Sequence, residues 1–504
     1  MILIATLLVP ALGAIAAAAL PARKERTARI VATVAAGLAF LLSLALWVRL
    51  RGRLPVPIVL NGEPQPGLHP WVDVRYAWAP DLDLSFHLGV DGISWPLVVL
   101  TTLLTLLCCG YTVWQGEAIP DGRRLLALLL VIEVGIVGVF VALDLVLFFV
   151  FFEVTLLPMF AVIAGWGGPG RRHAARKFVL YTLLGSVLLL VGVFTVVAAA
   201  GTADLVMLTA NGGAGISRGT QIVAFTLLAL AFAVKSPLWP LHTWLPDAHT
   251  EAPTVGSVIL AGVLLKLGTY GLIRVVGVVP EGAAALAPIV GVLATAAILV
   301  GSLVCLAQTE LKRLIAYSSV GHMGFVLLGI ATLSAAGIQA AVIGNIAHGV
   351  ITGLLFFLAG AIKDRTHTGE LTELGGLRET APGLAGLLGF GAIASLGLPG
   401  LAGFWGEMFA VYAALRHATP LWVALGVLAA LGGALTAAYF LRLLRRVTHG
   451  TAARSVMGVP GLAAGELIAW APLVVLAVAL GLVPGLVLWL SEAPVQSLVA
   501  VVPS

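Results

Sequence analysis

Long apolar runs, separated by short polar segments, repeat from one end of the chain to the other. Most of these runs reach the length of about 20 residues that a helix needs to cross the hydrocarbon core of a bilayer. The pattern predicts an all-α polytopic membrane protein with about 14 transmembrane helices. The predicted segments are 2–20, 28–50, 90–114, 124–143, 145–166, 177–200, 220–246, 253–276, 284–307, 312–332, 337–362, 382–416, 420–446 and 466–490.

The longest polar segment, 51–89, contains Pro, Asp, Trp and His residues and predicts an ordered surface hairpin or a short pair of strands. It lies outside the membrane within an N-terminal unit, 1–114, of three helices. We expect two five-helix units to follow, at 123–276 and 284–446. A last transmembrane helix and its tail are expected at 466–504.

Two predicted segments are too long and too interrupted to be simple helices. Segment 220–246 contains Pro237, and segment 382–416 contains Pro399 in a glycine-rich run. Proline removes a backbone donor and clashes with the preceding turn, so we expect each segment to be discontinuous there. Paired breaks are typical of inverted-repeat transporters. Pro237 and Pro399 are 162 residues apart, close to the offset between the two five-helix units, which favours an inverted repeat over two ordinary proline kinks.

Composition narrows the class of protein. The chain is 60% hydrophobic and 10% charged, with a mean hydropathy of +1.08, whereas soluble chains carry about 25% charged residues. The net charge is +5, but no basic run is interleaved with aromatic residues, so we expect no nucleic-acid partner. Cys108, Cys109 and Cys305 lie in apolar stretches without the spacing of metal ligands. We therefore expect no metal and no cofactor in this chain.

The distribution of cations predicts the orientation in the membrane. Most of the 28 lysines and arginines fall in loops that follow odd-numbered segments, such as Arg23, Arg172, Lys312 and Arg365. Because cytoplasmic loops are enriched in these residues, the odd-numbered loops are predicted to be cytoplasmic and both termini to be outside. Arg274 is assigned to an external border. The first apolar run is interpreted as an uncleaved span, because its basic cluster follows it.

Seven ionisable residues lie inside predicted membrane segments. A charge at that depth costs about 2.5–3.5 kcal/mol on insertion scales, so each residue needs a functional or structural reason to be there. Their order along the chain, which runs from acids through lysines and histidines to a last acid, suits a lateral proton pathway. They are Glu133, Glu153, Lys235, Lys266, His322, His348 and Glu407.

These residue types fit proton transfer. Burial weakens the hold of a lysine on its proton and a nearby carboxylate strengthens it, so a moving carboxylate would make the lysine bind or release a proton. Histidine takes and passes protons near neutral pH. Lys235 stands two residues before Pro237, where a broken helix exposes carbonyls and admits water.

The same residues also have structural interpretations. Lys235 could belong to a buried structural ion pair, and Lys266 could reach an interface, although it lies near the middle of its segment. His322 and His348 are equally compatible with satisfied core histidines. Asp144, at a junction between two segments, is interpreted as a helix cap.

The stretch after segment 220–246 is also polar. Asp247, His249 and Glu251 are placed in a loop there, where they would cap the next segment or line an entrance. Glu153, by contrast, ends a run of phenylalanines that is too apolar for a membrane rim, which favours a functional role.

At these positions the chain resembles the antiporter-like subunits of respiratory complex I, the proton-pumping NADH:quinone oxidoreductase. The combination of motifs follows the predicted segments 5 to 12 in order and is highly specific. The matching stretches are 151–158 (FFEVTLLP), 233–249 (AVKSPLWPLHTWLPDAH), 251–254 (EAPT), 264–274 (LLKLGTYGLIR), 311–324 (LKRLIAYSSVGHMG) and 403–407 (GFWGE).

The resemblance implies a role for each matched residue. Glu153 matches a glutamate that pairs with the lysine at position Lys235, and this pair is expected to act as a switch. Lys266 matches a lysine of a central polar axis. His322 and His348 match polar positions that carry this axis toward the second broken helix.

Glu407 matches the ionisable residue at that second broken helix and is expected to be the terminal proton donor or acceptor. In two of the three sister subunits this residue is typically lysine, whereas glutamate is typical of subunit M, whose mitochondrial counterpart is subunit 4. The length and the fourteen predicted spans also resemble those of subunit M.

The resemblance implies a bacterial plasma membrane and, as partners, the other membrane and peripheral subunits of complex I, especially neighbouring antiporter-like subunits. Electron transfer on those partners would drive proton translocation here, so NADH, FMN, iron–sulfur clusters and quinone are expected on them. Two alternatives stay open. One is a subunit of a multi-subunit sodium/proton antiporter or of a membrane-bound hydrogenase, and the other is a passive scaffold between pumping neighbours.

Overall fold

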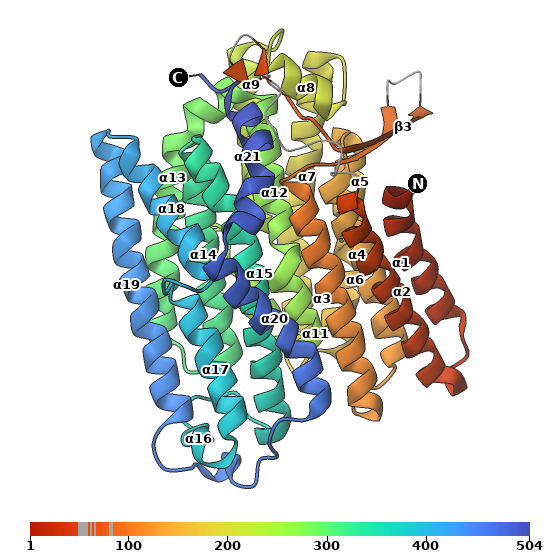
Figure 1. Ribbon diagram of the computed structural model, residues 1–504, viewed down its shortest axis with the longest axis vertical. Helices are drawn as coiled ribbons and strands as arrows, with labels where there is room; N and C mark the ends of the chain where they lie inside the picture. The colour runs from red at the N-terminus through yellow and green to blue at the C-terminus, as the bar shows by residue number, and fades with distance from the viewer. Residues whose placement is uncertain (49–58, 61–62, 65–66, 80–83, 504) are drawn as a thin grey trace.

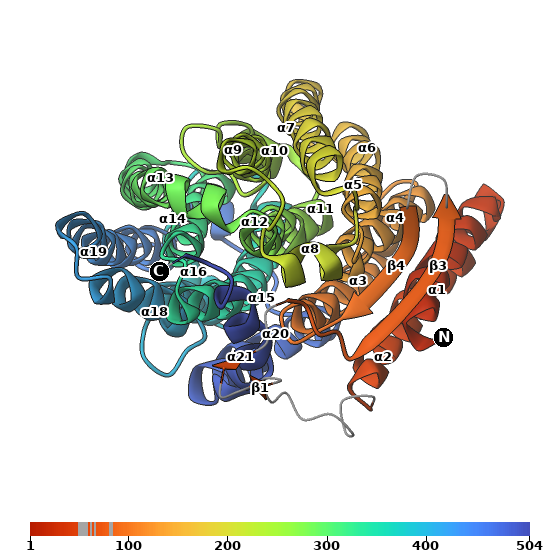
Figure 2. The ribbon, with the colours of Figure 1, turned by 90° about the horizontal axis from the view of Figure 1, so that it is seen from above.

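The chain folds into long helices that run roughly parallel to one another, as the computed structural model shows in Figure 1. The structure describes residues 1–48, 59–60, 63–64, 67–79 and 84–503, and the rest of the predicted segment 51–89 lies outside the described residues. Seen from above (Figure 2), the molecule is elongated. Helices α1 and α2 lie at one end and α19 lies at the other.

Within the described residues, thirteen helical stretches are long and apolar enough to cross a membrane. The remaining predicted segment, 382–416, is formed by two shorter helices, which confirms the all-α polytopic fold. The helices that build the predicted spans are α1 (Ile2–Ala19), α2 (Glu25–Ala45), α3 (Ser94–Gln115), α4 (Gly122–Val141), α5 (Leu145–Val154), α6 (Leu156–Trp166), α7 (Arg171–Ala200), α9 (Arg218–Lys235), α11 (Thr254–Ile259), α12 (Lys266–Val278), α13 (Pro280–Ala307), α14 (Leu311–Ala331), α15 (Ala335–Thr366), α17 (Pro382–Ser395), α18 (Gly403–Arg416), α19 (Pro420–Thr448) and α20 (Ala464–Leu482).

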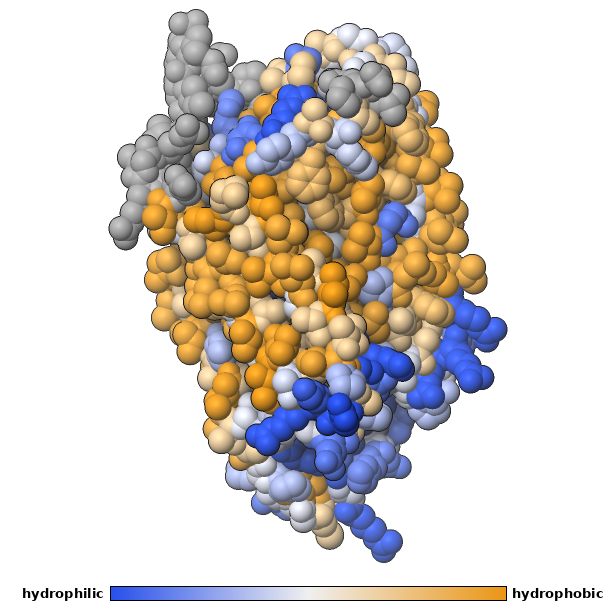
Figure 3. Space-filling view, turned by 90° about the vertical axis from the view of Figure 1, so that its right-hand side faces the viewer, coloured by the Kyte–Doolittle hydropathy of each residue, from blue (hydrophilic) through white to orange (hydrophobic). Residues whose placement is uncertain are grey.

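The surface agrees with a membrane environment. Figure 3 shows an apolar band across the middle of the face turned to the viewer, with hydrophilic residues gathered toward its two ends. Helix α7 contributes to the outer surface with exposed Leu180, Leu184 and Phe194. Large apolar side chains exposed in such number are typical of a surface that faces lipid or partner proteins.

The helices at the centre are buried on every side. The stretch Thr254–Val278 is buried throughout its most apolar window, and α14 and α15 are nearly so. Figure 2 shows α11, α12 and α15 surrounded by the other helices. Since these helices face protein all around, they can hold charged side chains that a lipid-facing helix could not.

The predicted break at Pro237 is present. Helix α9 ends at Lys235, and a short helix, α10 (Trp244–Glu251), follows after a turn. The Trp244 indole donates a hydrogen bond to the carbonyl of Val234 at 3.0 Å, so a side chain satisfies backbone that the break has freed. Asp247, His249 and Glu251 therefore belong to α10, and their predicted placement in a loop is wrong.

The predicted break at Pro399 is present as well. It separates α17 from α18, and Gly397 and Gly400 adopt positive φ angles of 71° and 94° in the connecting turn. Glycine adopts this conformation without the clash that a Cβ causes. Helix α20 satisfies the break, because the Ala477 carbonyl accepts from the backbone of Ala402 at 3.0 Å.

A third break was not predicted. Between α11 and α12 the segment forms a π-helical turn, Leu260–Leu264, in which the backbone N–H of Leu265 donates to the carbonyl of Leu260 at 3.3 Å. Such turns occur frequently at functional sites, and this one immediately precedes Lys266. No proline marks it, which is why the sequence pattern suggested a continuous helix.

The predicted last segment, 466–490, is also discontinuous. Helix α20 ends at Leu482, and α21 (Gly485–Val499) begins just after Pro484, which cannot continue the preceding helix. The tail is thus helical rather than extended. The other short helices are α8 (Leu205–Asn211) and α16 (Leu377–Thr380), with single 3₁₀ turns at Ala22–Lys24, Gly116–Ala118 and Arg454–Val456.

The predicted strand pair in 51–89 is confirmed for the described residues. Strands β3 (Val72–Ala79) and β4 (Leu84–Val90) form an antiparallel hairpin, and β1 (Val59–Leu60) pairs with β2 (Glu63–Pro64). Figure 2 shows β3 and β4 crossing one end of the helices near α1 to α4. The carbonyl of His87 accepts from the backbone of Leu143 at 2.9 Å, which fixes the hairpin to the α4–α5 junction.

Candidate functional site

Lys266 lies at the π-helical turn, fully buried in the centre of the molecule. Because the N–H of Leu265 bonds to Leu260 instead of Ala261, the Ala261 carbonyl is free to accept from Nζ of Lys266 at 2.5 Å. The same Nζ lies 2.6 Å from Nδ1 of His348. The break therefore supplies the lysine with an acceptor that a regular helix would not offer.

The contact between Lys266 and His348 fixes the direction of hydrogen bonding when the lysine is charged. An ammonium only donates, so Nδ1 of His348 accepts and the ring carries its proton on Nε2. That Nε2 is buried and has no protein partner among the described residues. A proton that moves from Lys266 to Nδ1 would free the proton on Nε2 to leave on the other side of the ring.

His348 continues toward a second histidine. Its ring centroid lies 5.8 Å from that of His322, and Nδ1 of His322 lies 2.8 Å from Oε1 of Glu407. The hydroxyl of Ser395 lies 3.0 Å from Nε2 of His322. The four predicted residues Lys266, His348, His322 and Glu407 thus form one row that crosses α12, α15, α14 and α18.

A small cavity lies beside this row. It has a volume of about 30 Å³, and its lining includes His322, His348, Thr352, Ser395 and Glu407. A cavity of roughly 10–15 Å³ is enough to hold one water molecule. There is room for water to bridge the two histidine rings.

Two close helix contacts place the residues of the row. A Cβ on Gly349 would lie 2.6 Å from the carbonyl oxygen of Gly262, so glycine there lets α15 approach the π-helical turn and brings His348 to Lys266. A Cβ on Gly406 would lie 2.6 Å from Cα of Gly344. That second contact lets α18 approach α15 closely and so positions the turn of α18 that carries Glu407.

Lys235 forms a separate group at the end of α9. Its side chain is buried, and Nζ donates to the hydroxyl of Thr155 at 3.4 Å and lies 4.6 Å from the ring centroid of Phe152. Glu153 is close enough for its charge to act on Lys235, but no hydrogen bond or ion pair joins the two residues in the described part of the chain. The hydroxyl and the aromatic face take the place of the carboxylate that we predicted as the direct partner.

Glu133 lies apart from both groups. It is fully buried in α4, and neither carboxylate oxygen has a hydrogen-bond partner among the described residues. Its charge acts on Cys109 of the neighbouring helix α3. The structure therefore brings four of the seven predicted residues into one row, places Lys235 near Glu153, and joins Glu133 to neither group by a hydrogen bond among the described residues.

Several polar residues near the row were not singled out from the sequence. Ser395 contacts His322, and Thr269, one turn after Lys266, donates to Oδ1 of Asn345 at 2.8 Å. Asn345 stands one helical turn before His348, so the two side chains lie on the same face of α15. This spacing could have identified Asn345 from the sequence. Ser395 lies just before the Pro399 break, and no spacing to another predicted residue marks it in the sequence.

Two cations that the sequence pattern placed in loops or at borders have buried side chains. Arg274 is buried in α12, where its Nη1 pairs with Oδ2 of Asp91 at 2.7 Å. Its Nε also donates to the hydroxyl of Tyr270 at 2.9 Å. Lys312 is only 5% exposed, and its Nζ donates to the carbonyl of Ala252 at 3.1 Å. A partner far away in sequence satisfies each cation, which hydropathy along the chain cannot reveal.

Charges also meet at the hairpin end of the molecule. The two nitrogens of the buried His87 ring lie 2.9 Å from Oδ1 of Asp73 and 3.1 Å from Oδ2 of Asp204. Arg75 pairs with the same Asp204 oxygen at 2.9 Å. Burial lowers the pKa of His87, but the hydrogen bonds and charges of Asp204 and Asp73 outweigh burial and raise that pKa above its usual value. Asp144 caps α5, as predicted, by accepting from Val146 and Leu147.

Comparison with known proteins places the chain in a family. The family described as "NADH:quinone oxidoreductase/Mrp antiporter, TM" matches residues 142–432, which is more than half of the chain. The chain is 42% identical over 475 residues to NADH-quinone oxidoreductase subunit M of Rhodobacter capsulatus, covering 92% of this chain and 88% of that protein. It is 44% identical over 381 residues to NAD(P)H-quinone oxidoreductase chain 4 1 of Synechococcus sp. (strain JA-3-3Ab), covering 75% and 72%.

Solved structures give the same result. A chain of respiratory complex I from Thermus thermophilus with bound NADH matches over 100% of both chains, with a TM-score of 0.85 and 31% identity. A chain of the Mrp complex from Dietzia sp. DQ12-45-1b matches over 99% of both chains, with a TM-score of 0.82 and 25% identity. The chain therefore belongs to the NADH:quinone oxidoreductase/Mrp antiporter family of membrane subunits, among relatives named subunit M and chain 4.

Proposed function

We propose that this chain is a proton-translocating membrane subunit of an NADH:quinone oxidoreductase complex and corresponds to subunit M. The names of its relatives and its match to a complex I chain support this assignment. The observation that carries it is the buried row Lys266–His348–His322–Glu407, in which adjacent groups touch or face each other across the centre of the apolar band.

The row can pass a proton by exchange at each ring. A charged Lys266 gives its proton to Nδ1 of His348, and the proton on Nε2 of that ring leaves toward His322. His322 accepts at Nε2, beside the Ser395 hydroxyl, and releases the proton on Nδ1 to Oε1 of Glu407. Each histidine ends neutral in the other tautomer, and a rotation of its ring restores the starting arrangement before the next proton passes in the same direction.

Lys235 and Glu153 are proposed to drive this row rather than to belong to it. Lys235 rests against a hydroxyl and an aromatic ring, which hold an ammonium more weakly than a carboxylate does. A shift of Lys235 toward or away from Glu153 would change the field at Lys266 and hence its tendency to release a proton. Electron transfer from NADH to quinone, through FMN and iron–sulfur clusters, is assigned to partner subunits.

The test is NADH-driven proton pumping by membrane vesicles that carry Lys235→Ala or Lys266→Ala, with assembly checked on a native gel. We expect the assembled variants to lose about ten-fold or more in pumping, because a positioned proton donor contributes roughly 10²–10⁴-fold to the rate of proton transfer. Arg176→Gln, which removes an exposed cation far from the row, serves as the control and should pump normally. Normal pumping by both lysine variants would contradict the proposal and favour a scaffold.

A second candidate is a subunit of a multi-subunit sodium/proton antiporter, because the chain matches the Mrp complex from Dietzia sp. with a TM-score of 0.82. The two candidates differ in their partners and in their ion. Isolation of the intact complex should recover NADH- and quinone-binding subunits under the first proposal. Recovery of a complex without them, and transport that requires sodium, would favour the antiporter.

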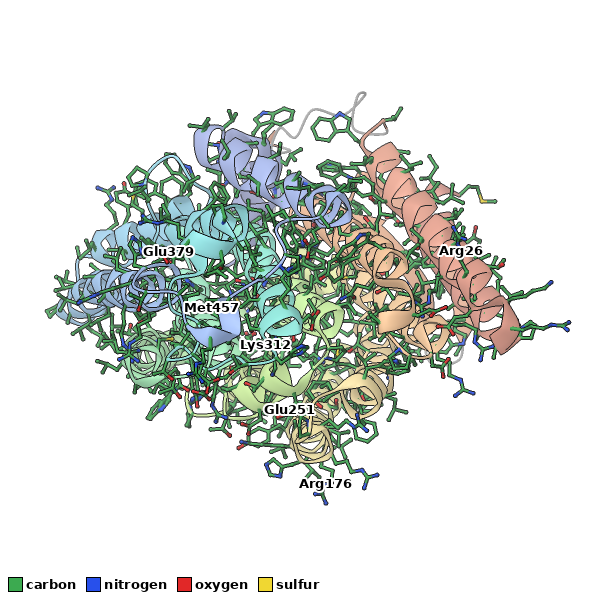
Figure 4. All side chains as sticks on the ribbon, turned by 90° about the horizontal axis from the view of Figure 1, so that it is seen from below. Arg26, Arg176, Glu251, Lys312, Glu379 and Met457 are labelled. Atoms are coloured by element: carbon green, nitrogen blue, oxygen red, sulfur yellow. The ribbon has the colours of Figure 1, made fainter. Side chains whose placement is uncertain are left out.

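We also propose that the complex lies in a bacterial plasma membrane with both termini of this chain outside. The structure fits the cation pattern, since the end opposite the hairpin, seen in Figure 4, carries Arg26 of α2 and Arg176 of α7. A reporter fused to the C-terminus that is active only outside the cytoplasm would test this orientation.

A further inference from the structure

A cavity of about 860 Å³ lies at the hairpin end of the molecule, apart from the central row. Its walls come from the start of α13, the turn between α14 and α15, the end of α18 and the start of α19. The last described residues, among them Val499 and Pro503, also line it, and Figure 2 shows the C-terminus over the region between α13, α18 and α19. Sites for small molecules have volumes of roughly 300–1,000 Å³, so this cavity is large enough for a ligand.

Arg416, the last residue of α18, brings a positive charge to this cavity. Tyr412 stands one helical turn earlier and also lines the cavity, so the guanidinium and the phenol lie on the same face of the helix. Neither side chain forms a hydrogen bond or an ion pair with a described residue. No Asp or Glu is among the described residues that line the cavity. The cavity therefore presents a cation without a countercharge and a free hydroxyl.

The start of α15 adds to this positive potential. Ala335 and Ala336, the first two residues of this 32-residue helix, line the cavity. The Ser334 hydroxyl accepts from the backbone of Gly337, and the N–H groups of Ala335 and Ala336 have no acceptor among the described residues. A helix carries about half a positive charge at its N-terminus. The helix end and Arg416 therefore favour an anion in the same cavity.

The rest of the lining is mostly apolar and reaches toward the membrane. Ala284 and Pro288 lie four and eight residues after Pro280, the first residue of α13, which corresponds to about 6 and 12 Å along the helix. Ala331 and Ala413 extend these apolar walls on α14 and α18. A small soluble anion would use only the polar end of such a cavity, whereas a ligand with an apolar part would fill it.

The surroundings of the cavity are typical of a membrane interface. Tyr412 and Trp422 line it, and these two residue types are enriched where a membrane meets water. Leu415 and Leu421, each adjacent in sequence to a lining residue, are exposed, as expected for a surface that faces lipid. The cavity therefore lies where a phospholipid has its headgroup.

We propose that this cavity binds the phosphate headgroup of an anionic phospholipid, with Arg416 as its main contact. A guanidinium binds phosphate oxygens through two parallel N–H donors, and the Tyr412 hydroxyl offers one more donor. The apolar walls receive the glycerol and the first part of the acyl chains. The inference goes beyond the proposed function and does not depend on it, because binding is measured without turnover.

The test uses the assembled complex in vesicles of phosphatidylcholine that contain a minor fraction of phosphatidylglycerol with a photoactivatable group near its headgroup. After irradiation, mass spectrometry of the digested chain locates the attached lipid. We expect label on residues 331–336 and 412–422, and about ten-fold less label in Arg416→Gln, because a charge-assisted hydrogen bond is lost. Arg218→Gln, which removes another exposed cation at the same end, should label as wild type.

Three results of this experiment would overturn the inference. Label in Arg416→Gln at the wild-type level would show that the guanidinium is not the contact. Equal labelling by phosphatidylcholine with the same photoactivatable group would remove the preference for an anionic lipid. An absence of label from the wild-type complex would show that protein covers the cavity.

A second variant separates a built cavity from a merely exposed cation. Ala284→Leu fills part of the cavity and leaves Arg416 in place, so we expect it to reduce the label as well. A native gel confirms that each variant assembles. Wild-type labelling of Ala284→Leu would show that Arg416 attracts lipid only as a surface charge, and the inference would fail.

Inorganic phosphate distinguishes the two sources of a phosphate group. It is added in excess at constant ionic strength, because added salt alone would screen exposed charges. Label that persists supports the lipid, whose acyl chains hold the headgroup in place. Label that is displaced would assign the cavity to free phosphate and would overturn the inference.

Discussion

Buried charges occur in two settings in this molecule, and the settings differ in how completely the charges are paired. Near the hairpin, Asp91 forms an ion pair with Arg274 at 2.7 Å and accepts hydrogen bonds from the backbone of Ile93 and Ser94 at 3.0 and 2.9 Å. In the central row, Nε2 of His348 has no hydrogen-bond partner among the residues that the structure describes, and Nδ1 is bonded to Lys266.

The difference teaches how to separate structural from transporting charges. A fully paired ion is held in one state, because losing its proton or its partner would break several bonds at once. A group with one partner and one free position can exchange its proton without dismantling the site. His348 of the central row shows this second pattern, and Asp91 shows the first.

The sharpest way to break this comparison is to remove His348. His348→Leu deletes the acceptor of Lys266 and the path to His322, so we expect proton pumping to fall by about 100-fold while the complex still assembles. Pumping is measured in vesicles, with His417→Leu, an exposed histidine on the outer surface, as the matched control. Substantial pumping in His348→Leu would show that the row is not the path.

A smaller effect on pumping, but a large one on stability, is expected for the paired setting. Asp91→Asn leaves Arg274 buried without its countercharge, which costs about 3–5 kcal/mol when one partner of a buried pair is removed. We expect less assembled complex and a lower melting temperature, with near-normal pumping per assembled complex. The double variant Asp91→Asn with Arg274→Met should recover much of the stability. A selective loss of pumping in Asp91→Asn would place this pair in the transport path.

The smallest effect concerns His87, which is paired on both nitrogens but can still titrate. Its pKa is raised in the folded protein, so its stabilising contribution is fully present below its unfolded pKa of about 6.5 and is lost as pH rises through the higher folded pKa. We expect His87→Gln to lower the melting temperature of the complex by a few degrees in mildly acidic buffer and by less in alkaline buffer. An equal difference at every pH would show that the charge of His87 does not hold the hairpin.

Much of the architecture could be predicted from the sequence, because a helix that crosses the lipid needs a run of about 20 apolar residues, which is visible in the sequence. The breaks at Pro237 and Pro399 were found, because proline removes a backbone donor and clashes with the preceding turn of a helix. The break before Lys266 was missed because a π-helical turn has no residue that requires it. Likewise, α21 was merged with α20 because both are apolar.

The residues of the site could be predicted from the sequence, but the contacts between them could not. Charged residues in apolar segments are rare enough that Lys266 and Glu407 stand out without a structure. Which of them touch depends on helix contacts between residues far apart in the chain, such as Gly349 against Gly262. That is why the contact of Lys266 with His348, and the separation of Lys235 from Glu153, came only from the structure.

The π-helical turn also sets the rotational phase of the segment that contains it. Thr254 packs against Gly360 and Lys266 bonds to His348, so two residues twelve positions apart face the same neighbour, α15. In an uninterrupted α-helix, which advances about 100° per residue, residues that far apart would point about 120° away from each other. The one extra residue in the π-helical turn reduces that mismatch to about 20°. Deleting a single residue from Leu260–Leu264 would therefore leave Thr254, Lys266 and His348 unchanged and yet rotate either Thr254 or Lys266 away from α15.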